Sequence, residues 1–589
     1  MKRLKMGRIF FLLISVGILA AGCPNANDED SQGIARTFKS LTQNGSAKTA
    51  TTKLTLTFDD DITGLAASDI TLTAGTTGAN KGALTRTTKG VYDLALSGIT
   101  NSGSVTVLAE KSGYTITGGP KTVSIFCLLS IDDGDNRPLG SGNSLTLTIG
   151  ARRDLKPHLG DGAAGKTITW TSSAATVASV NNGIVTAVNF SSGGTSTASS
   201  AATGTATITA KSTDNAFTQT FTITTTMAGQ IDMMSTTPLK DRFADYFLIG
   251  NIATQSNYST GTSGTITNQR LIRHYNVLTA ENHMKPDSFS SGYNSSTGAI
   301  TYTWTNADNF VNAATNSGFK ILAHVLLWHS QIPQWQKDLG NPSKKDEALT
   351  AMKKFITDVV TRYKGKIWAW DVLNEVFPDG VSAGADWKTS MRTTGDSQGP
   401  NPWYVAIGSD FVYEGYLAAR LADPAAILYY NDYNLDNAGK ATMVRNMVRD
   451  VNARYAEAYP AAGRKLIEGI GMQSHHNTNV SVNSIKATLD RFKPLGVKIS
   501  ISEIDVLSQS WSDYSSSTPP TNSQKLTAAN LYGDYFKLFI QYSDIIERVT
   551  FWGVYDEQSW RARGLPLIFE GSSTSRAKPA YYKIVGALD

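Results

Sequence analysis

Two glutamates in this sequence end apolar stretches in which a charged side chain is costly. Glu375 closes the run "IWAWDVLNE" and Glu503 lies near the end of "VKISISEIDV", and both runs are typical of buried strands. A carboxylate at such a strand end loses solvation, so either it is paired or its pKa serves chemistry. Two carboxylates in one site can have different catalytic roles, because one can stay protonated while the other stays ionised. The alternative, a pair of surface or salt-bridged glutamates, fits poorly with two apolar strands.

The C-terminal part of the chain, residues 229–589, alternates helical patterns with short apolar runs. Eight such runs follow one another: "YFLIGNIA", "NVLTAEN", "FKILAHVLLWH", "IWAWDVLNE", "AILYYNDYN", "IEGIGMQSHH", "VKISISEIDV" and "RVTFWGVYD". Eight strand-like runs separated by helical stretches predict an α/β fold of the (β/α)8 TIM barrel type, and periodicity alone leaves a doubly wound open sheet as the alternative. Nearly every run ends in polar or aromatic residues, as expected at the C-terminal mouth of a closed barrel, so we favour the barrel.

The ends of these runs together resemble glycoside hydrolase family 10, the endo-β-1,4-xylanases. The matching pieces, in the family's order over Ser235 to Asp589, are "TAENHMKP", "AHVLLWHSQIPQW", "WDVLNE", "YNDYN", "GIGMQSHH", "ISEIDV" and "TFWGVYDEQSW". The resemblance implies a retaining glycosidase that hydrolyses internal β-1,4-xylosidic bonds of xylan by double displacement, with no cofactor and no metal. A related endo-β-1,4-glucanase and a non-catalytic surface protein that binds carbohydrate are the alternatives.

The same resemblance assigns roles to the catalytic residues. Glu375 is the acid/base, and Glu503 is the nucleophile that attacks the anomeric carbon. His475 is expected to hydrogen-bond the nucleophile, with Asp505 holding the histidine. Asn374 matches the residue that bonds the 2-hydroxyl of the sugar being cleaved.

Further residues match the family's substrate-binding groups, which combine indole faces for sugar rings with polar groups for hydroxyls. They are Glu281, Asn282, Lys285, His324, Trp328, Gln331, Gln473, Trp552 and Trp560. By strand alternation His329 and His476 should point away from the site, and the histidines show no metal-ligand spacing. Trp368 and Trp370 precede the strand end, which favours packing. The loop after the seventh strand has two possible interpretations. Trp511 and Tyr514 contact the leaving-group side of the substrate, or the loop is a disordered rim.

The chain begins with an apparent targeting segment. Four basic residues within the first eight positions precede the apolar run Ile9 to Ala21, which is too short to span a bilayer and is typical of an export signal. Residues 1–22 resemble a bacterial lipoprotein signal because the run ends in "LAAGC", which places a lipid on Cys23. Leu19 departs from that pattern by one position, and a plain signal peptide is the alternative.

Residues 23–34 are polar and are expected to form a flexible tether, so the resemblance predicts a lipid-anchored protein at the cell surface or outer membrane, or otherwise a secreted one. Cys127 is the only other cysteine, so lipidation of Cys23 would exclude an intramolecular disulfide.

Between the tether and the barrel the sequence is rich in Thr, Ser, Gly and Ala, with short alternating runs and turn residues. This pattern predicts two all-β sandwiches, residues 35–126 and 127–228. The second contains "ITWTSSAATVASVNNGIVTAV", which resembles a bacterial immunoglobulin-like domain; the first is also interpreted as immunoglobulin-like. Trp170 is the single tryptophan of this half and suits a sandwich core, which favours spacers over sugar-binding modules.

The overall composition limits the possible partners. A chain of 589 residues is too long for one ordinary domain, and its net charge of +5 is small and comes largely from the first few residues. Nothing therefore indicates a nucleic-acid or polyanionic partner. We expect a monomer that binds xylan or xylo-oligosaccharides.

Overall fold

The computed structural model describes part of the chain. The described residues are 33–46, 50–99, 102–127, 129–132, 138–139, 144–159, 167–190, 203–213, 218–258, 264–393 and 399–589. The predicted signal, Cys23 and nearly all of the predicted tether lie outside them. Two compact units are present, Met1–Ser130 with His158–Gly165, and Ile131–Pro157 with Lys166–Asp589. Within the described ranges, no helix has both the length and the apolar character needed to cross a membrane.

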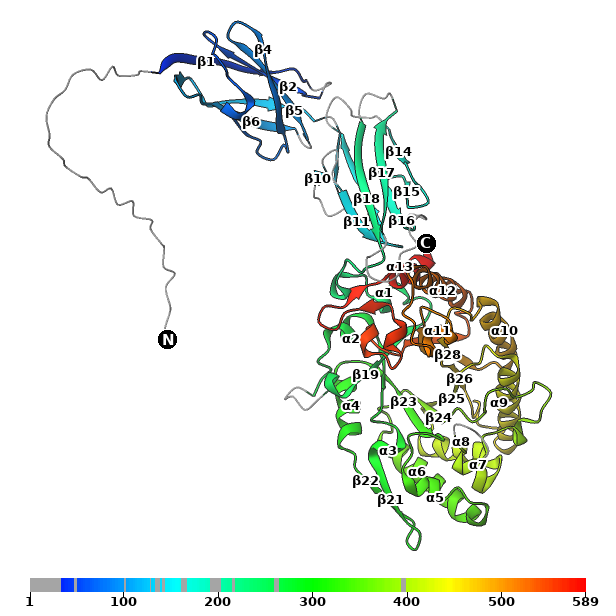
Figure 1. Cartoon of the computed structure of the whole chain (residues 1–589). Coiled ribbons are helices and arrows are strands. Elements are labelled where there is room, and N and C mark those ends of the chain that lie inside the picture. Colours follow the sequence, from blue (N-terminus) through cyan, green and yellow to red (C-terminus); the bar gives the residue numbers. More distant parts are fainter. Residues whose placement is uncertain are drawn as a thin grey trace, which may run out of the picture. The chain divides into compact units, whose positions relative to one another are not determined.

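The first unit contains two packed sheets (Figure 1). Its strands are β1 (Ile34–Gln43), β2 (Lys53–Phe58), β3 (Ile70–Thr73), β4 (Asn80–Thr88), β5 (Val91–Ser97), β6 (Gly103–Ala109), β7 (Tyr114–Thr117) and β8 (Lys121–Ile125). One sheet has the order β4-β5-β2-β1-β7 and the other β3-β6-β8. Alternate residues of β2, such as Leu54 and Leu56, are fully buried with Val105 and Val107 of β6, as the period of a strand requires. The all-β prediction is confirmed here.

A second all-β region follows along the chain. Its strands are β9 (Leu129–Asp132), β10 (Pro138–Leu139), β11 (Ser144–Thr148), β12 (Arg152–Asp154), β13 (Lys156–Leu159), β14 (Ile168–Ser172), β15 (Ala178–Asn181), β16 (Ile184–Ala187), β17 (Thr203–Ser212) and β18 (Thr218–Thr226). The pair Asn182 and Gly183, both with positive φ, turns β15 into β16. Trp170 packs edge-on against the buried Phe221, with ring centroids 6.4 Å apart, but it is only partly buried, so it lies at the border of the core rather than inside it as the sequence predicts.

The eight strands of the C-terminal region form one closed parallel sheet. They are β19 (Leu248–Ala253), β20 (Val277–Ala280), β23 (Lys320–Leu327), β24 (Ala369–Asn374), β25 (Ile427–Asp432), β26 (Gly469–Met472), β28 (Lys498–Val506) and β29 (Ile546–Phe551). Each pairs in parallel with its neighbours, and the pairings β26–β28 and β19–β29 close the ring. All eight predicted runs therefore become strands of a barrel, and the open-sheet alternative is wrong.

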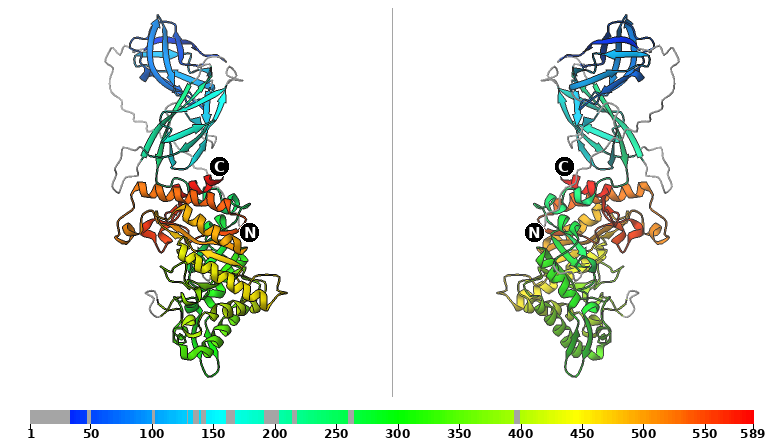
Figure 2. Two further views of the ribbon diagram at one scale, coloured as in Figure 1. Left: turned by 90° about the vertical axis from the view of Figure 1, so that its right-hand side faces the viewer. Right: turned by 90° about the vertical axis from the view of Figure 1, so that its left-hand side faces the viewer.

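Helices surround the barrel strands (Figures 1 and 2). They are α1 (Leu239–Arg242), α2 (Gln269–His274), α3 (Pro286–Phe289), α4 (Thr305–Asn316), α5 (Gln334–Asp338), α6 (Lys345–Arg362), α7 (Pro402–Ile407), α8 (Asp410–Ala422), α9 (Ala438–Ala458), α10 (Val482–Phe492), α11 (Trp511–Ser515), α12 (Asn522–Gln541) and α13 (Pro579–Val585). Short pairs β21 (Ser290–Asn294) with β22 (Ala299–Tyr302), and β30 (Phe569–Glu570) with β31 (Arg576–Ala577), complete the region, with the two-residue β27 (His475–His476) beside β28.

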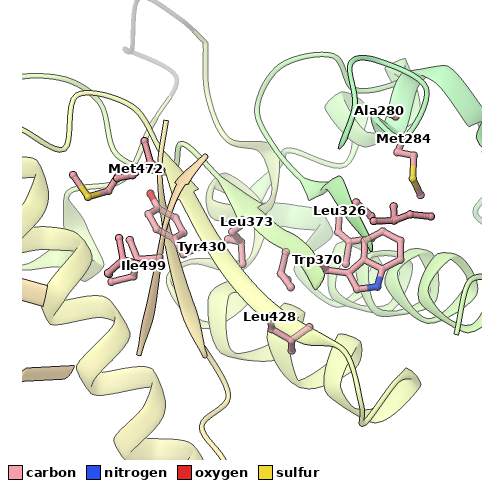
Figure 3. Close-up of a cluster of buried hydrophobic side chains, with 14 of the residues drawn as sticks. Ala280, Met284, Leu326, Trp370, Leu373, Leu428, Tyr430, Met472 and Ile499 are labelled. Carbon is pink, nitrogen blue, oxygen red and sulfur yellow. The ribbon is translucent and has the colours of Figure 1, made fainter. Parts of the chain in front are cut away.

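The core of this region lies between the strands and the helices. The long helices bury one face each; α6, for example, buries Met352, Phe355 and Val359 at helical spacing. Figure 3 shows a buried cluster that includes Trp370, which is 1% exposed. The expected packing role of Trp370 fits this position. Packed outer faces hold the strands rigidly, so the side chains at their C-terminal ends have fixed positions.

Candidate active site

A cleft of about 760 Å³ lies at the C-terminal ends of the barrel strands. It is lined by Glu281, Asn282, Lys285, His324, Trp328, Gln331, Asn374, Glu375, Asp379, Tyr433, Asn434, Gln473, His475, Asn477, Glu503, Trp511, Trp552, Trp560 and Arg561. The structure thus brings together at one cleft every site residue predicted in the barrel except Asp505, which lies behind His475. These side chains come from the ends of seven strands, which explains their wide separation in sequence.

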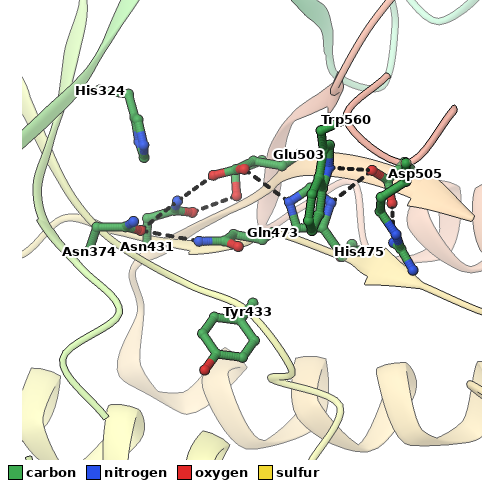
Figure 4. Close-up of polar contacts among 12 residues, drawn as sticks. His324, Asn374, Asn431, Tyr433, Gln473, His475, Glu503, Asp505 and Trp560 are labelled. Carbon is green, nitrogen blue, oxygen red and sulfur yellow. Dashed lines mark hydrogen bonds and ion pairs between the residues drawn. The ribbon is translucent and has the colours of Figure 1, made fainter. Parts of the chain in front are cut away.

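Glu503 is held by a line of polar side chains (Figure 4). Its Oε1 accepts a hydrogen bond from Asn431 Nδ2 at 2.8 Å, and its Oε2 lies 3.1 Å from His475 Nε2. The other ring nitrogen of His475 lies 3.0 Å from Asp505 Oδ2. This arrangement follows from register, since β27 pairs His475 with Asp505, and residues 503 and 505 share one face of β28. The geometry is therefore the chain of contacts that the resemblance implied.

Arg561 completes this line, and the sequence did not predict it. Arg561 Nη1 donates to Asp505 Oδ1 at 2.5 Å, its Nη2 donates to the carbonyl oxygen of His476 at 3.1 Å, and Trp560 Nε1 donates to Asp505 Oδ2 at 3.2 Å. Asp505 is fully buried, and a buried carboxylate needs a cation or several donors. The available signal was the position of Arg561 directly after Trp560 in "SWRARG".

These contacts fix the charges around Glu503. Burial disfavours a charged imidazole, but Asp505 and Glu503 outweigh burial and raise the pKa of His475 to about 9. Burial also opposes the charge of the two carboxylates. The pKa of Glu503 is nevertheless lowered, mainly by His475. The pKa of Asp505 is lowered by His475 and Arg561. At neutral pH two anions thus alternate with two cations, and Glu503 is held in its ionised form.

Glu375 has different surroundings. Its Oε2 accepts a hydrogen bond from Trp328 Nε1 at 2.9 Å and its Oε1 accepts one from Gln473 Nε2 at 2.7 Å. Both donors are neutral. The residue has a φ of +53°, which an L residue adopts only where its neighbours fix the backbone. They do so here, because the amide of Glu375 donates to the carbonyl of Asn431 at 2.9 Å and its carbonyl accepts from Arg392 Nε at 2.8 Å.

Two side-chain amides connect the carboxylates. Asn431 Nδ2 donates to Glu503 and, at 3.0 Å, to Asn374 Oδ1; Gln473 Nε2 donates to Glu375 and, at 3.2 Å, to the same Asn374 oxygen. Asn431 is a site residue that sequence reasoning missed, although it stands in the quoted motif "YNDYN". Gly471 makes room for it, because a Cβ atom there would overlap Asn431 Oδ1. The amides fix the relative position of the two carboxylates.

At one end of the cleft a compact polar cluster comes from the loops after β20 and β23. Lys285 Nζ donates to Asn282 Oδ1 at 3.0 Å and to Gln331 Oε1 at 2.7 Å, and it lies 5.4 Å from the centre of the Trp328 ring. Burial lowers the pKa of Lys285 and raises that of Glu281. The predicted polar residues of this subsite are therefore positioned by one another.

Aromatic rings form the walls around the histidines. The Trp552 ring lies 5.9 Å from that of His324 and 6.4 Å from that of His475, and the Trp560 ring lies 5.2 Å from that of His475. His324 Nδ1 lies 2.9 Å from Asp371 Oδ2, which orients the ring.

The remaining predictions about this region concern residues expected outside the cleft. His329, His476, Trp368 and Trp370 do not line it, as predicted. Burial lowers the pKa of His476 to about 3. Over the part of the chain that the structure describes, no group of His, Cys, Asp and Glu could hold a metal ion.

Comparison with known proteins identifies the family. Residues 238–587 match the family described as Glycosyl hydrolase family 10. The chain belongs to this family. The carboxylates found at the ends of β24 and β28 thus lie on a glycosyl hydrolase barrel, as the resemblance of the strand ends predicted.

Individual members of family 10 are similar to this chain over the same region. An endo-1,4-β-xylanase A of Thermotoga neapolitana is 34% identical over 365 residues, which are 59% of this chain and 30% of that protein, so the chain matches less than a third of this relative's length. An endo-1,4-β-xylanase of Geobacillus stearothermophilus is 33% identical over 60% of this chain and 99% of that protein.

A solved structure extends the similarity beyond the barrel. It is the crystal structure of a family 10 xylanase from termite gut that contains a bacterial Ig-like domain. It is 49% identical, covers 76% of this chain and 98% of its own, and superposes with a TM-score of 0.69.

Proposed function

We propose that the protein is a retaining endo-1,4-β-xylanase that hydrolyses internal β-1,4-xylosidic bonds of xylan. Membership of family 10 and the names of the relatives support the substrate. The observation that carries the mechanism is the contrast between the two carboxylates. Glu503 lies in a line of alternating charges, whereas neutral groups donate to Glu375. The first environment suits a nucleophile that stays ionised, and the second suits a group that gains and loses a proton.

The first step forms a glycosyl-enzyme. An oxygen of Glu503 attacks the anomeric carbon while the bond from that carbon to the glycosidic oxygen breaks, and Glu375 gives its proton to the departing oxygen. Asn374, fixed by Asn431 and Gln473, is placed to bond the 2-hydroxyl of the sugar, a contact that strengthens as the anomeric carbon gains positive charge.

The second step returns the enzyme to its starting state. Glu375, now ionised, takes a proton from water as the water oxygen attacks the anomeric carbon, and the bond to Glu503 breaks. Two inversions give a product with retained β configuration. Glu503 is then again a free carboxylate next to His475, and Asp505 has kept its contacts with His475 and Arg561 throughout.

Reducing-end release from two polysaccharides tests the substrate. We expect the purified chain to cleave xylan and to leave carboxymethyl cellulose nearly intact. Preferential cleavage of carboxymethyl cellulose would replace the proposal with an endoglucanase. If neither polymer releases reducing ends but either one is retained in affinity electrophoresis, the protein is a binding protein.

We further propose that Cys23 carries a lipid anchor and that the two all-β regions are immunoglobulin-like spacers, which hold the barrel away from the surface. The similarity to the termite-gut xylanase with its Ig-like domain supports the second region's assignment. Labelled palmitate should enter the wild-type protein and be absent from Cys23→Ser, with Cys127→Ser as the matched control. Incorporation that survives Cys23→Ser would exclude this anchor.

A further inference from the structure

The barrel contains a buried arginine that has no role in the hydrolysis described above. Arg548 is the third residue of β29, and the fold buries it completely. Neither its Nε atom nor its two Nη atoms have a hydrogen-bond partner among the described residues. A buried guanidinium without acceptors is strongly destabilising, so its five N–H groups require a partner that the described side chains do not supply.

Strand register places Arg548 in the barrel interior below the cleft. Alternate residues of a strand share one face, so Arg548 and Thr550 lie on the same side of β29 as Trp552, which lines the cleft just past the strand end. The guanidinium lies 6.0 Å from the centre of the Tyr429 ring on β25. Because β26 and β28 separate β25 from β29 in the ring of strands, the side chain of Arg548 extends across the interior.

Further buried polar atoms of the same interior are without a partner among the described residues. They are the hydroxyl oxygens of Thr279, Ser500 and Thr550 and the Oδ1 atom of Asp371. Ser500 pairs with Arg548 in the sheet. Thr279 shares one face of β20 with Val277, which packs in one buried cluster with Tyr429. The hydroxyls can donate or accept and the carboxylate can only accept, so this set complements the donors of Arg548.

Asp371 connects this interior to the cleft. Its Oδ2 atom lies 2.9 Å from Nδ1 of His324, which lines the cleft. In the sheet Asp371 pairs with His324 on one side and with Tyr429 on the other. Burial lowers the pKa of Arg548, and the charge of Asp371 is the strongest influence that opposes this effect. Asp371 is therefore the main counter-charge of Arg548, although no direct hydrogen bond joins the two.

Water suits both groups better than an anion does. A water molecule accepts from a guanidinium and donates to a carboxylate, and a buried water typically makes about three hydrogen bonds. An anion would also accept from Arg548, but it would be repelled by the charge of Asp371. Glu503 and Glu547 also act on Arg548 through their charges and would add to this repulsion.

We propose that Arg548 and Asp371 hold an ordered water site in the barrel interior, and that through this site Arg548 is a positioning residue for His324. The water accepts from the guanidinium and donates to Asp371 Oδ1, so Asp371 stays ionised and accepts from Nδ1–H of His324. Nε2 of His324 then carries no proton and can accept a hydrogen bond from a sugar hydroxyl. The water site stands by itself, whereas the use of His324 rests on the proposed function.

Crystallography of the full chain tests the water site without any measurement of activity. At high resolution, the wild type should show an ordered water within hydrogen-bond distance of both Arg548 and Asp371, and Arg548→Met should lose it. Crystals soaked in bromide should show no anomalous peak at this position. A direct hydrogen bond between Arg548 and Asp371 without water, or a bound bromide ion, would overturn the site.

Nitrogen NMR of the chain labelled with ¹⁵N-histidine tests the positioning role. The signals of His324 are those lost in His324→Gln, and in the wild type its Nε2 should be unprotonated. In Arg548→Met the buried Asp371 loses its counter-charge and takes up a proton, so the ring should shift toward the Nε2–H tautomer. Arg548→Lys keeps the charge and should keep the wild-type tautomer. An unchanged tautomer in Arg548→Met, or in Arg548→Gln if the former fails to fold, would overturn the positioning role.

Kinetics with a matched control separate this role from general destabilisation. Because His324 is expected to contact bound sugar before and during reaction, Arg548→Met should raise KM for xylohexaose about tenfold and change kcat little. Arg420→Met removes another buried arginine, on α8 and away from the cleft, and should lower the melting temperature without changing KM or the His324 signals. A lower kcat with an unchanged KM in Arg548→Met would contradict the positioning role. If the wild type cleaves no xylan, the proposed function fails, while the water and the tautomer still decide this inference.

Discussion

The two carboxylates of the cleft have the same side chain and opposite surroundings. Glu503 lies inside β28, 5% exposed, next to His475, whose pKa of about 9 keeps it charged, and Asp505 and Arg561 continue the line. The carboxylate of Glu375, in contrast, accepts hydrogen bonds from an indole and an amide, those of Trp328 and Gln473. The proposed division of roles, with Glu503 as a lasting anion and Glu375 as a proton carrier, rests on this difference between their neighbours rather than on the residue type.

The backbones differ as well. Glu503 has ordinary strand geometry, whereas Glu375 has a φ of +53° just past the end of β24 and is held there by Asn431 and Arg392. A residue past the strand end is free of the alternation that directs strand side chains to one face of the sheet or the other, whereas a residue inside the strand, such as Glu503, is bound by it; both side chains line the cleft. Four changes test this contrast, from the largest expected effect to the smallest.

Removing the anion should have the largest effect. Glu503→Gln keeps the size of the side chain and removes the nucleophile, so kcat on xylan should fall about 10⁵-fold whatever the leaving group. Steady-state rates on xylan and on dinitrophenyl xylobioside measure this loss, and Glu457→Gln, an exposed glutamate on α9, is the control. A loss that disappears with the dinitrophenyl substrate would reverse the two roles.

Removing the proton carrier should give a loss that depends on the substrate. Glu375→Ala should reduce the rate on xylan about 10³-fold, but a dinitrophenyl leaving group needs no proton, so the burst that reports glycosyl-enzyme formation should persist. Azide should accelerate turnover and give β-xylobiosyl azide. An equal loss on both substrates, without azide rescue, would contradict the assignment.

Loosening the backbone of Glu375 should have a smaller effect. Arg392→Met removes the donor to its carbonyl and the donor to the Tyr433 hydroxyl at 2.7 Å. Because the carboxylate is then positioned less well, kcat on xylan should fall about tenfold, with little change on dinitrophenyl xylobioside. Comparing the loss of kcat on xylan with the loss on dinitrophenyl xylobioside measures this effect of positioning. A uniform loss accompanied by a lower melting temperature would mean that Arg392 only supports the fold.

The charge of His475 should make the stability of the folded chain depend on pH. Its pKa is raised from 6.5 to about 9 in the folded state, so the folded chain holds this proton more tightly than the unfolded chain. The resulting stabilisation is complete below pH 6.5 and is lost as pH rises toward 9. Melting temperatures across this range should converge for wild type and His475→Gln at high pH. A constant difference would show that the ring acts through packing alone.

The sequence predicted the barrel and most of the cleft because those features depend on local patterns. Each of the eight strands is an apolar run, and the site residues predicted in the barrel lie in the C-terminal half of such a run or in the segment after it. The sequence did not predict Arg561, Asn431 and Arg392, because these residues contact Asp505, Glu503 and Glu375 from distant parts of the chain, and only the folded structure brings them together. Burial of Asp505 required a cation, but no local spacing indicates which arginine of "SWRARG" would reach it. Similarly, the segment around Trp511, for which a disordered rim was one interpretation, is held by Gln524 of α12 and by Arg563, which donate to Asp513 and to the carbonyl of Tyr514.

Covalent trapping tests the division of roles most directly. A dinitrophenyl 2-deoxy-2-fluoro-β-xylobioside should form the glycosyl-enzyme and hydrolyse it slowly, so that mass spectrometry of the intact chain and of its peptides can locate the sugar. We predict one fluoroxylobiosyl group per chain, attached to Glu503, and none in Glu503→Gln. A label on Glu375, or inactivation without any covalent adduct, would contradict the account.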